Sequence, residues 1–265
     1  MRNIFKKNSG WVRLQQGALF SGAISESLDD SQGIFGLIIT PRCDLSNKKV
    51  STVHYLPVIP FKIWKYNVLA QIYQFTEYDK FTKIINKFCE DNNVSPTLFD
   101  VKYNFAIPDI EKSISHIRGY KDILNQFQER SKLANLTYCQ QKIKVWAKGK
   151  DKIKDLLENK HSHYYMIEDW RDGNNYLVIM LREVKRLELS FAEKMEKGIN
   201  EKILAESDDY KNDIRRSLNK TDVYKFQQVI DSPYLEHIME SFAKNFCRIG
   251  IDRIDESILN NLIDE

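Results

Sequence analysis

Apolar residues gather in short runs near the two ends of the chain and follow a different spacing in the middle. Runs of four to eight apolar residues bounded by Gly, Pro, Ser or Asn are typical of strands. Such runs predict strands at 11–14, 17–22, 34–40, 53–59, 163–167, 176–187 and 223–230. Asp172-Gly173-Asn174-Asn175 predicts a turn between two of them, because Gly and Asn tolerate positive φ. Pro57 predicts an edge position or a bulge in its strand, because it cannot donate a backbone hydrogen bond.

Between positions 61 and 160 the spacing of apolar residues becomes helical. Val68, Ile72 and Phe75 recur at three and four residues, and a similar pattern continues from Phe81 to Phe88. Ser95-Pro96 and Pro108-Asp109 are sequences that often begin helices. This change of period predicts a helical insertion or lobe over residues 61–160.

The C-terminal third combines charged and amphipathic segments. We predict a helix over 191–204 and a mobile loop over the highly charged stretch 206–220. Asp231-Ser232-Pro233 predicts the start of a further helix that stops near Gly250, and a short final helix is predicted over 256–263. The helix after Pro233 carries an apolar stripe at i, i+3, i+4 and i+7 spacing, formed by Leu235, Ile238, Met239, Phe242 and Phe246.

Strand signals at both ends and helix signals between them predict an α+β fold. We expect a small bent antiparallel sheet or SH3-like barrel built from both chain ends, with the C-terminal helix packed on the sheet. Residues 1–60 and 161–265 would form this α/β core domain, and residues 61–160 the helical insertion. Such an arrangement would bring the segment 232–237 near the first strands.

Composition narrows the function classes. Hydrophobic residues make up 42% of the 265 positions, enough for a real core. A formal charge of +3, from 40 basic and 37 acidic residues, lacks the basic excess of a dedicated nucleic-acid binder. The chain shows no secretory signal and no run of 18 apolar residues, so we expect a cytoplasmic protein with no membrane contact. The four scattered cysteines predict free thiols, and we predict neither a metal nor a cofactor.

Two segments resemble a known group of proteins. Thr40-Pro41-Arg42-Cys43-Asp44-Leu45 resembles the TxxCD(L/I) motif of an uncharacterised bacterial family associated with mobile elements and phage defence. Ser232-Pro233-Tyr234-Leu235-Glu236-His237, followed by Phe242-Ala243 and Arg248-Ile249-Gly250, resembles the C-terminal SPYxEH…FA…RIG motif of the same family. This resemblance implies a defence or stress-response setting and no particular activity.

A second resemblance covers residues 17–60, whose order of strands and loops is similar to the start of the MazF/PemK-type toxin barrel. That resemblance implies an SH3-like barrel. The toxins have Arg-Pro before the second strand and Thr after the third, where this chain has Gly33-Ile34 and Pro60-Phe61. The toxins' nuclease residues therefore do not carry over.

The sharpest candidate for chemistry is the thiol and carboxylate of Cys43 and Asp44, which follow a strongly apolar strand. A Cys held at a strand end can act as a nucleophile when a nearby base or cation favours its thiolate. His237 is the candidate base. The structural alternatives are a buried Cys beside an Asp that accepts turn N–H groups, and a His that anchors its helix.

Two further segments carry candidate sites. A lysine-rich run could meet phosphates and a base through Lys142, Lys144, Trp146, Lys148 and Lys150, or it could be a solvated helix face. His161 and His163 could share one strand face as metal ligands, but no third ligand is evident and a polar entry to the strand is the simpler interpretation.

These observations support three functional hypotheses. The first is a non-enzymatic component of a bacterial defence or stress-response module that binds a protein partner. The second is a hydrolase or nuclease that uses Cys43, Asp44 and His237. The third is a nucleic-acid-binding module that uses residues 142–154.

Overall fold

A computed structural model describes residues 4–6, 11–26, 28, 33–103, 105–173, 175–200 and 223–246 of the chain. The chain divides into two compact units. Unit 1 comprises Met1–Ile59 and Glu158–Glu265, and unit 2 comprises Pro60–Leu157. The predicted loop 206–220, the stop at Gly250 and the final helix 256–263 lie outside the described residues.

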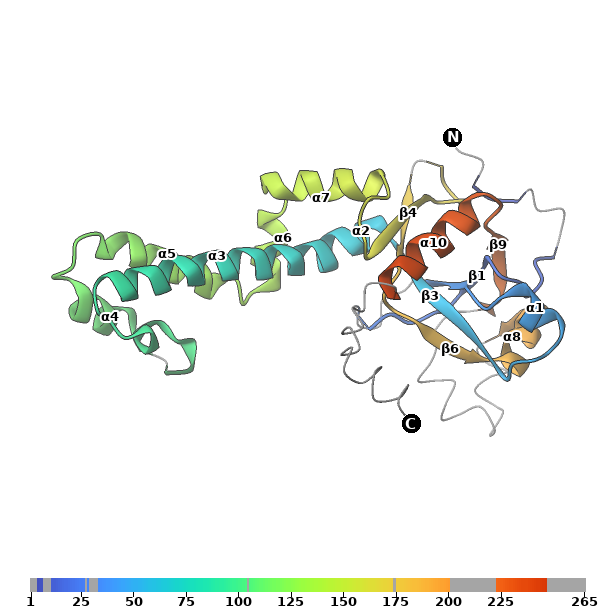
Figure 1. The fold of residues 1–265 in the computed structure, drawn as a ribbon, viewed down its shortest axis with the longest axis horizontal. Coiled ribbons are helices and arrows are strands. Elements are labelled where there is room, and N and C mark those ends of the chain that lie inside the picture. Colours follow the sequence, from blue (N-terminus) through green and yellow to red (C-terminus); the bar gives the residue numbers. More distant parts are fainter. Residues whose placement is uncertain are drawn as a thin grey trace, which may run out of the picture. The chain divides into compact units, whose positions relative to one another are not determined.

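Unit 1 is built on a curled antiparallel sheet (Figure 1). Its strands follow the order β4-β5-β3-β2-β1-β9, with β6 paired to β3 beside this path. Their bounds are β1 Ala18–Ser21, β2 Phe35–Ile38, β3 Thr52–Pro60, β4 Tyr164–Glu168, β5 Tyr176–Met180, β6 Lys185–Glu188 and β9 Phe226–Val229. A two-stranded ladder, β7 Ile199–Asn200 with β8 Val223–Tyr224, completes the strands of the described residues.

Both chain ends enter this one sheet. β1 pairs with β2 on one side, and on the other side it pairs with β9, more than 200 residues later. The sheet closes partway into a half-barrel, and the C-terminal helix α10 (Tyr234–Phe246) lies in the same unit. The predicted α+β class is therefore confirmed.

One face of the sheet packs against α10. Alternating residues of β2 and β3, such as Leu37 and Leu56, share a buried cluster with Leu235 and Ile238. Phe242 packs against the same cluster from a partly buried position. The apolar stripe of α10 therefore stabilises the sheet, since burying each such side chain contributes roughly 1.5–3 kcal/mol.

On the other face of the sheet, Gly36 leaves room for two aromatic rings. A Cβ atom at this position would come within 2.2 Å of the Phe20 ring and 2.9 Å of the Tyr55 ring. Phe20 and Tyr55 pack edge to face at a centroid distance of 5.0 Å. The missing side chain at Gly36 is what lets the aromatic pair cross the strand.

Several sequence predictions were wrong in detail, among them the strand at 11–14, where the described residues form no strand, and the strand at 223–230, which is split into β8 and β9. Pro57 lies inside the sheet, opposite Gly36 of β2, in a strand that also pairs with β5 and β6 and is therefore not an edge strand. The predicted strand over 176–187 breaks at a turn in which the amide of Glu183 donates to the carbonyl of Met180, so β5 and β6 are separate strands. The helix predicted over 191–204 is α8, Leu189–Met195, which stops before Gly198 at φ +79°.

Unit 2 is helical. Its long helix α3, Ala70–Asp91, continues from α2, Phe61–Trp64, through a π-helical turn at Lys65–Leu69. Two 3₁₀ turns, Pro96–Phe99 and Val101–Tyr103, follow α3. The remaining helices are α4 Ile107–Ile114, α5 Tyr120–Lys132, α6 Leu136–Lys142 and α7 Ala147–Leu157. Ser95-Pro96 thus begins a 3₁₀ turn, whereas Pro108 lies in the first turn of α4.

Two buried clusters hold unit 2 together along α3. The C-terminal half of α3 packs with α4 and α5 in a cluster that contains Ile85, Ile110 and Phe127. The N-terminal half packs with α6 in a cluster that contains Tyr73 and Cys139. A polar contact also joins α5 to α3, since Arg130 donates a hydrogen bond to the hydroxyl of Thr82 at 3.4 Å.

Candidate functional site

The segment that carries Cys43 and Asp44 turns from strand into helix. Buried Thr40 accepts a hydrogen bond from the backbone N–H of His54 at 2.6 Å, which fastens the end of β2 to β3. Pro41 then caps a short helix, α1, Arg42–Ser46, none of whose residues is buried. Cys43 is exposed, and its Sγ lies 3.6 Å from Oδ1 of Asp44. The alternative of a buried, apolar Cys43 is therefore wrong, because a helix begins where the sequence pattern predicted the buried end of a strand.

His237 lies on the exposed side of α10 and is held by β4. Its Nδ1 is 2.8 Å from the hydroxyl of Tyr165, and the two rings meet edge to face at 5.4 Å. Within the described residues no hydrogen bond joins Cys43 to His237. The predicted nucleophile and base are thus in one unit but are not seen as a pair, and their chemical role stays a prediction.

Electrostatics nevertheless connects the two segments that carry the motifs. A hydrogen bond from Ser232 lowers the pKa of Glu236, and the positive charges of Arg42 and Lys6 lower it further. Glu236 belongs to the C-terminal motif and Arg42 to the N-terminal one. The charge of a residue in the N-terminal motif therefore influences a carboxylate in the C-terminal motif, on the surface of unit 1.

His237 also lines a polar cavity of about 180 Å³ in unit 1. One wall is the segment that precedes β4, and the other is the outer side of α10. The lining residues are Asn159, Lys160, His161, Ser162, His237, Ser241, Lys244 and Asn245, and we call this the His–Lys pocket. All eight are polar or basic, and none is acidic.

The framework of the His–Lys pocket is tied together by hydrogen bonds. The side-chain carbonyl of Asn159 accepts from the amide of Met166 at 2.8 Å, which fixes the first wall to β4. The side-chain oxygen of Asn245 accepts from Nε of Arg182 at 3.3 Å. A further cation thus lies beside the cavity.

The two lysines of the pocket have acidic neighbours at the surface. Lys160 pairs with Glu158 and Lys244 with Glu240, each at 2.6 Å, and both lysine side chains are about two-thirds exposed. Exposed pairs of this kind contribute on the order of 0–1 kcal/mol, so a stronger anionic partner could displace them.

The two histidines of the HxH segment meet outside the strand. Their rings lie 5.6 Å apart, and the backbone N–H of His163 donates to Nδ1 of His161 at 3.2 Å. The described residues contain no group of three or more His, Cys, Asp or Glu that could hold a metal ion. His161 contributes to the His–Lys pocket, whereas β4 begins only at Tyr164.

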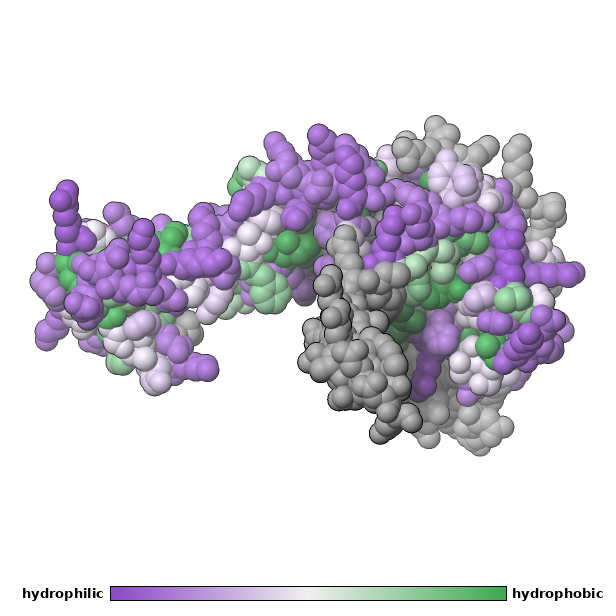
Figure 2. Space-filling model, in the orientation of Figure 1, coloured by the Kyte–Doolittle hydropathy of each residue, from purple (hydrophilic) through white to green (hydrophobic). Residues whose placement is uncertain are grey.

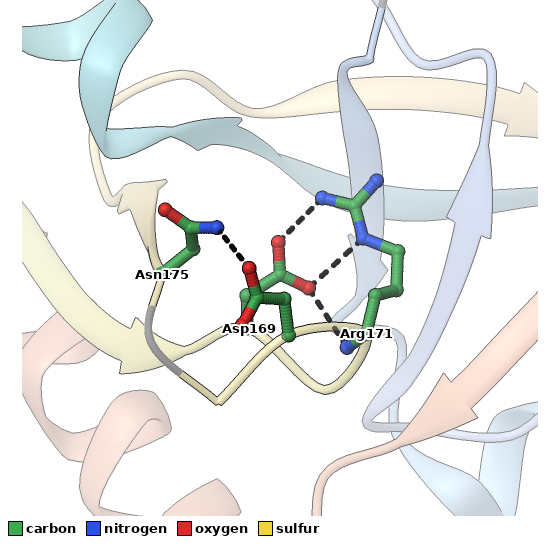
Figure 3. A network of polar contacts seen from close by, with 4 residues as sticks. Asp169, Arg171 and Asn175 are labelled. Carbon is green, nitrogen blue, oxygen red and sulfur yellow. Dashed lines mark hydrogen bonds and ion pairs between the residues drawn. The ribbon is translucent and has the colours of Figure 1, made fainter.

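A polar network around Asp169 and Arg171 has a structural role in unit 1 (Figure 3). The carboxylate of buried Asp169 accepts the amide of Arg171 at 3.0 Å and two guanidinium nitrogens of the same residue at 2.9 and 2.5 Å. The Arg171 guanidinium also stacks over the Phe35 ring at 4.6 Å. At the neighbouring turn, the amide of Asn175 donates to the Asp172 carboxylate, which confirms the predicted turn.

The lysine-rich segment belongs to unit 2. Lys142, Lys144, Lys148 and Lys150 are exposed, and hydrophilic residues cover α7 in Figure 2. Trp146 is packed edge to face on Tyr73 at 5.3 Å, and its indole N–H donates to Glu77 at 3.2 Å. The lysines are therefore accessible, while the indole is engaged in the helical core.

Sequence reasoning singled out His237, as a base, and His161, as a metal ligand, but missed the other residues of the His–Lys pocket. His237, Ser241, Lys244 and Asn245 follow i, i+4, i+7 and i+8 spacing, so a polar stripe on α10 could have been found. The first wall, residues 159–162, carries no periodic signal.

Comparison with protein-family models, curated proteins and solved structures finds no match to this chain. Among the described residues, no helix is long and apolar enough to cross a membrane.

Proposed function

We propose that this protein is a non-enzymatic, partner-binding component of a bacterial defence or stress-response module and that it acts in the cytoplasm. The resemblance of the TxxCD and SPYxEH segments supports the biological setting. Each of the two candidate catalytic groups has its own neighbour, since Nδ1 of His237 lies 2.8 Å from the Tyr165 hydroxyl and Sγ of Cys43 lies 3.6 Å from Asp44.

The observation that carries the proposal is the lining of the His–Lys pocket. Two lysines, two histidines and four neutral polar residues surround a small cavity that no carboxylate lines. Such a lining favours an anionic group, which could accept hydrogen bonds from the hydroxyls and amides and pair with the cations. A cavity of about 180 Å³ suits one acidic side chain of a partner protein better than a nucleic-acid duplex. The near-balanced charge of the chain also favours a protein partner over a nucleic acid.

The test uses a fluorescein-labelled hexaglutamate peptide and fluorescence anisotropy over a salt series. We expect binding that weakens with salt and a Kd about three- to tenfold higher for Lys244→Gln, the range that loss of one charge contact produces. Lys83→Gln is the matched control, because Lys83 also forms an exposed i,i+4 helix pair, with Asp79 at 2.7 Å. No binding of the peptide, or an equal effect of the two variants, would contradict the proposal.

The same anisotropy assay distinguishes a protein partner from the alternative, a nucleic acid bound by the lysine-rich segment. A labelled single-stranded oligonucleotide replaces the peptide, and Lys148→Gln/Lys150→Gln replaces the pocket variant. Tighter binding of the oligonucleotide, lost in this double variant and kept in Lys244→Gln, would favour a nucleic-acid-binding module and overturn the assignment of a protein partner.

A further inference from the structure

Arg130 of α5 is a buried cation in unit 2. Only 6% of the residue is exposed, and it lies between the two apolar clusters that follow α3. Its guanidinium carbon lies 5.5 Å from the centre of the Tyr78 ring and 5.4 Å from that of the Phe127 ring. A buried charge carries a large desolvation penalty unless an opposite charge compensates it.

The hydrogen bonds of Arg130 compensate only part of the desolvation penalty of its buried charge. One terminal nitrogen donates to the carbonyl oxygen of Phe99, and the other donates to the hydroxyl of Thr82 at 3.4 Å. Within the described residues its Nε is buried without a hydrogen-bond partner. A guanidinium has five N–H donors, and only two of those of Arg130 bond to the described residues.

No carboxylate of the described residues forms an ion pair with Arg130. Asp100, the nearest acid along the 3₁₀ turns, accepts the amide of Lys102 at 3.0 Å. Glu77 accepts from Trp146 and Lys80, and Glu129 accepts from Lys132. The acids of this part of unit 2 therefore have other partners.

Arg130 lines a cavity of about 410 Å³ between α3, α5 and the 3₁₀ turns. This volume falls within the usual range for small-molecule sites. Polar groups around it include Thr82, Asn86, Thr97 and Lys102, and Asp100 is the one acid in the lining. Lys102 and Thr97 are exposed, so they can meet a ligand from solvent.

We propose that this cavity, which we call the Arg130 pocket, binds the phosphate or carboxylate group of a small molecule. The oxyanion would supply the acceptor and the negative charge that Arg130 lacks, since a guanidinium pairs with two oxygens of such a group. Lys102 would add a second positive charge at the rim. This site is independent of the His–Lys pocket, and neither proposal depends on the other.

The test is isothermal titration of the full chain with inorganic phosphate and, separately, with acetate, both at constant ionic strength maintained with chloride. We expect saturable binding of one anion per chain. Whichever of phosphate and acetate binds with the lower Kd identifies the anionic group that the pocket prefers. Lys102→Gln should raise the Kd about three- to tenfold, and Arg130→Met should abolish saturable binding. Lys83→Gln, on the same helical unit, should leave the Kd unchanged.

Arg130 also anchors the 3₁₀ turn through Phe99, so its substitution could unfold unit 2. Far-UV circular dichroism reveals this, and Lys102→Gln then carries the test alone because its side chain is exposed. Absence of saturable binding of either anion to the folded wild-type chain would overturn the proposal. An equal effect of Lys102→Gln and Lys83→Gln would do the same, because it would indicate binding by general surface charge.

Discussion

The hydroxyl of Tyr165 and Nδ1 of His237 lie 2.8 Å apart and join β4 to α10 across 72 residues of sequence. Tyr165 is buried in the core of unit 1, whereas His237 stands on the exposed side of its helix. The bond therefore connects the packed sheet to a wall of the His–Lys pocket. It orients the imidazole from inside the fold.

Removal of this hydroxyl should weaken the attachment of α10. Tyr165→Phe is expected to lower the free energy of unfolding by about 0.5–1.5 kcal/mol, the usual net contribution of one hydrogen bond. Urea denaturation followed by circular dichroism measures it. Tyr176→Phe is the control, because Tyr176 is 39% exposed at the start of β5, and it should change stability by less than about 0.5 kcal/mol. Equal effects of the two variants would contradict the structural role of the bond.

Asp169 should make the stability of unit 1 depend on pH in the acid range. Burial alone would raise the pKa of Asp169, but the hydrogen bonds and positive charge of Arg171 outweigh it and lower the pKa below the ordinary value. The ionised carboxylate therefore stabilises the fold fully above about pH 4, the ordinary pKa of Asp, and this contribution is lost as pH falls through the lower folded-state pKa.

Asp169→Asn tests this dependence. The variant should be less stable at neutral pH by about 1–3 kcal/mol, and the difference from wild type should shrink as the solution becomes more acidic. Urea denaturation at a series of pH values measures both. A difference that stays constant down to the acid limit would show that the carboxylate charge is not involved.

The cysteines should differ sharply in reactivity. Cys43 is exposed, whereas Cys89 and Cys139 are buried and burial raises the pKa of both thiols. A thiol reagent added to the folded protein near neutral pH should label Cys43 first, and Cys89 and Cys139 should react only on unfolding. Cys43→Ser should remove this early labelling.

Two control variants complete the thiol experiment. Cys247 lies outside the described residues, so the assay is run in a Cys247→Ser background. His237→Ala tests the predicted Cys–His site. A shift in the pH profile of Cys43 labelling in this variant would support the hydrolase or nuclease hypothesis, and an unchanged profile would leave Cys43 as an exposed thiol without that base.

Gly36 should resist substitution because two aromatic rings occupy the space of its Cβ. Gly36→Ala is expected to destabilise unit 1 by about 1–3 kcal/mol, as overpacking usually does. Thermal unfolding measures this loss. Gly119→Ala is a useful contrast, since nothing lies within 4 Å of its added Cβ and only its φ of +84° opposes the change. A smaller loss at Gly36 than at Gly119 would contradict this account of the packing.

Local pattern was enough to predict most of the elements. The stripe at Leu235 and Ile238 predicted the buried face of α10, and the Asp172–Asn175 sequence predicted the hairpin turn. Both depend on residues within one or two turns of each other, where backbone geometry alone decides which side chains share a face. For the same reason, the change of apolar period near residues 60 and 160 was visible in the sequence.

The errors came where a distant strand or a single glycine changed the outcome. Pro57 lies inside the sheet because its strand β3 pairs with β2, β5 and β6, and α8 is short because Gly198 adopts positive φ. The sequence around Pro57 contains no sign of which distant strands will pair with β3. Only strand pairing across more than 120 residues decides that.

What the sequence by itself determined is the α+β class, the strands at both ends and the amphipathic helix that covers the sheet. The tertiary structure decided which polar side chains meet. His237 faces a wall formed by residues 159–162, and Arg130 lies buried between α3 and the 3₁₀ turns. The physical reason is that periodicity records which face of an element is apolar, whereas a site depends on the packing of elements that are far apart in the chain.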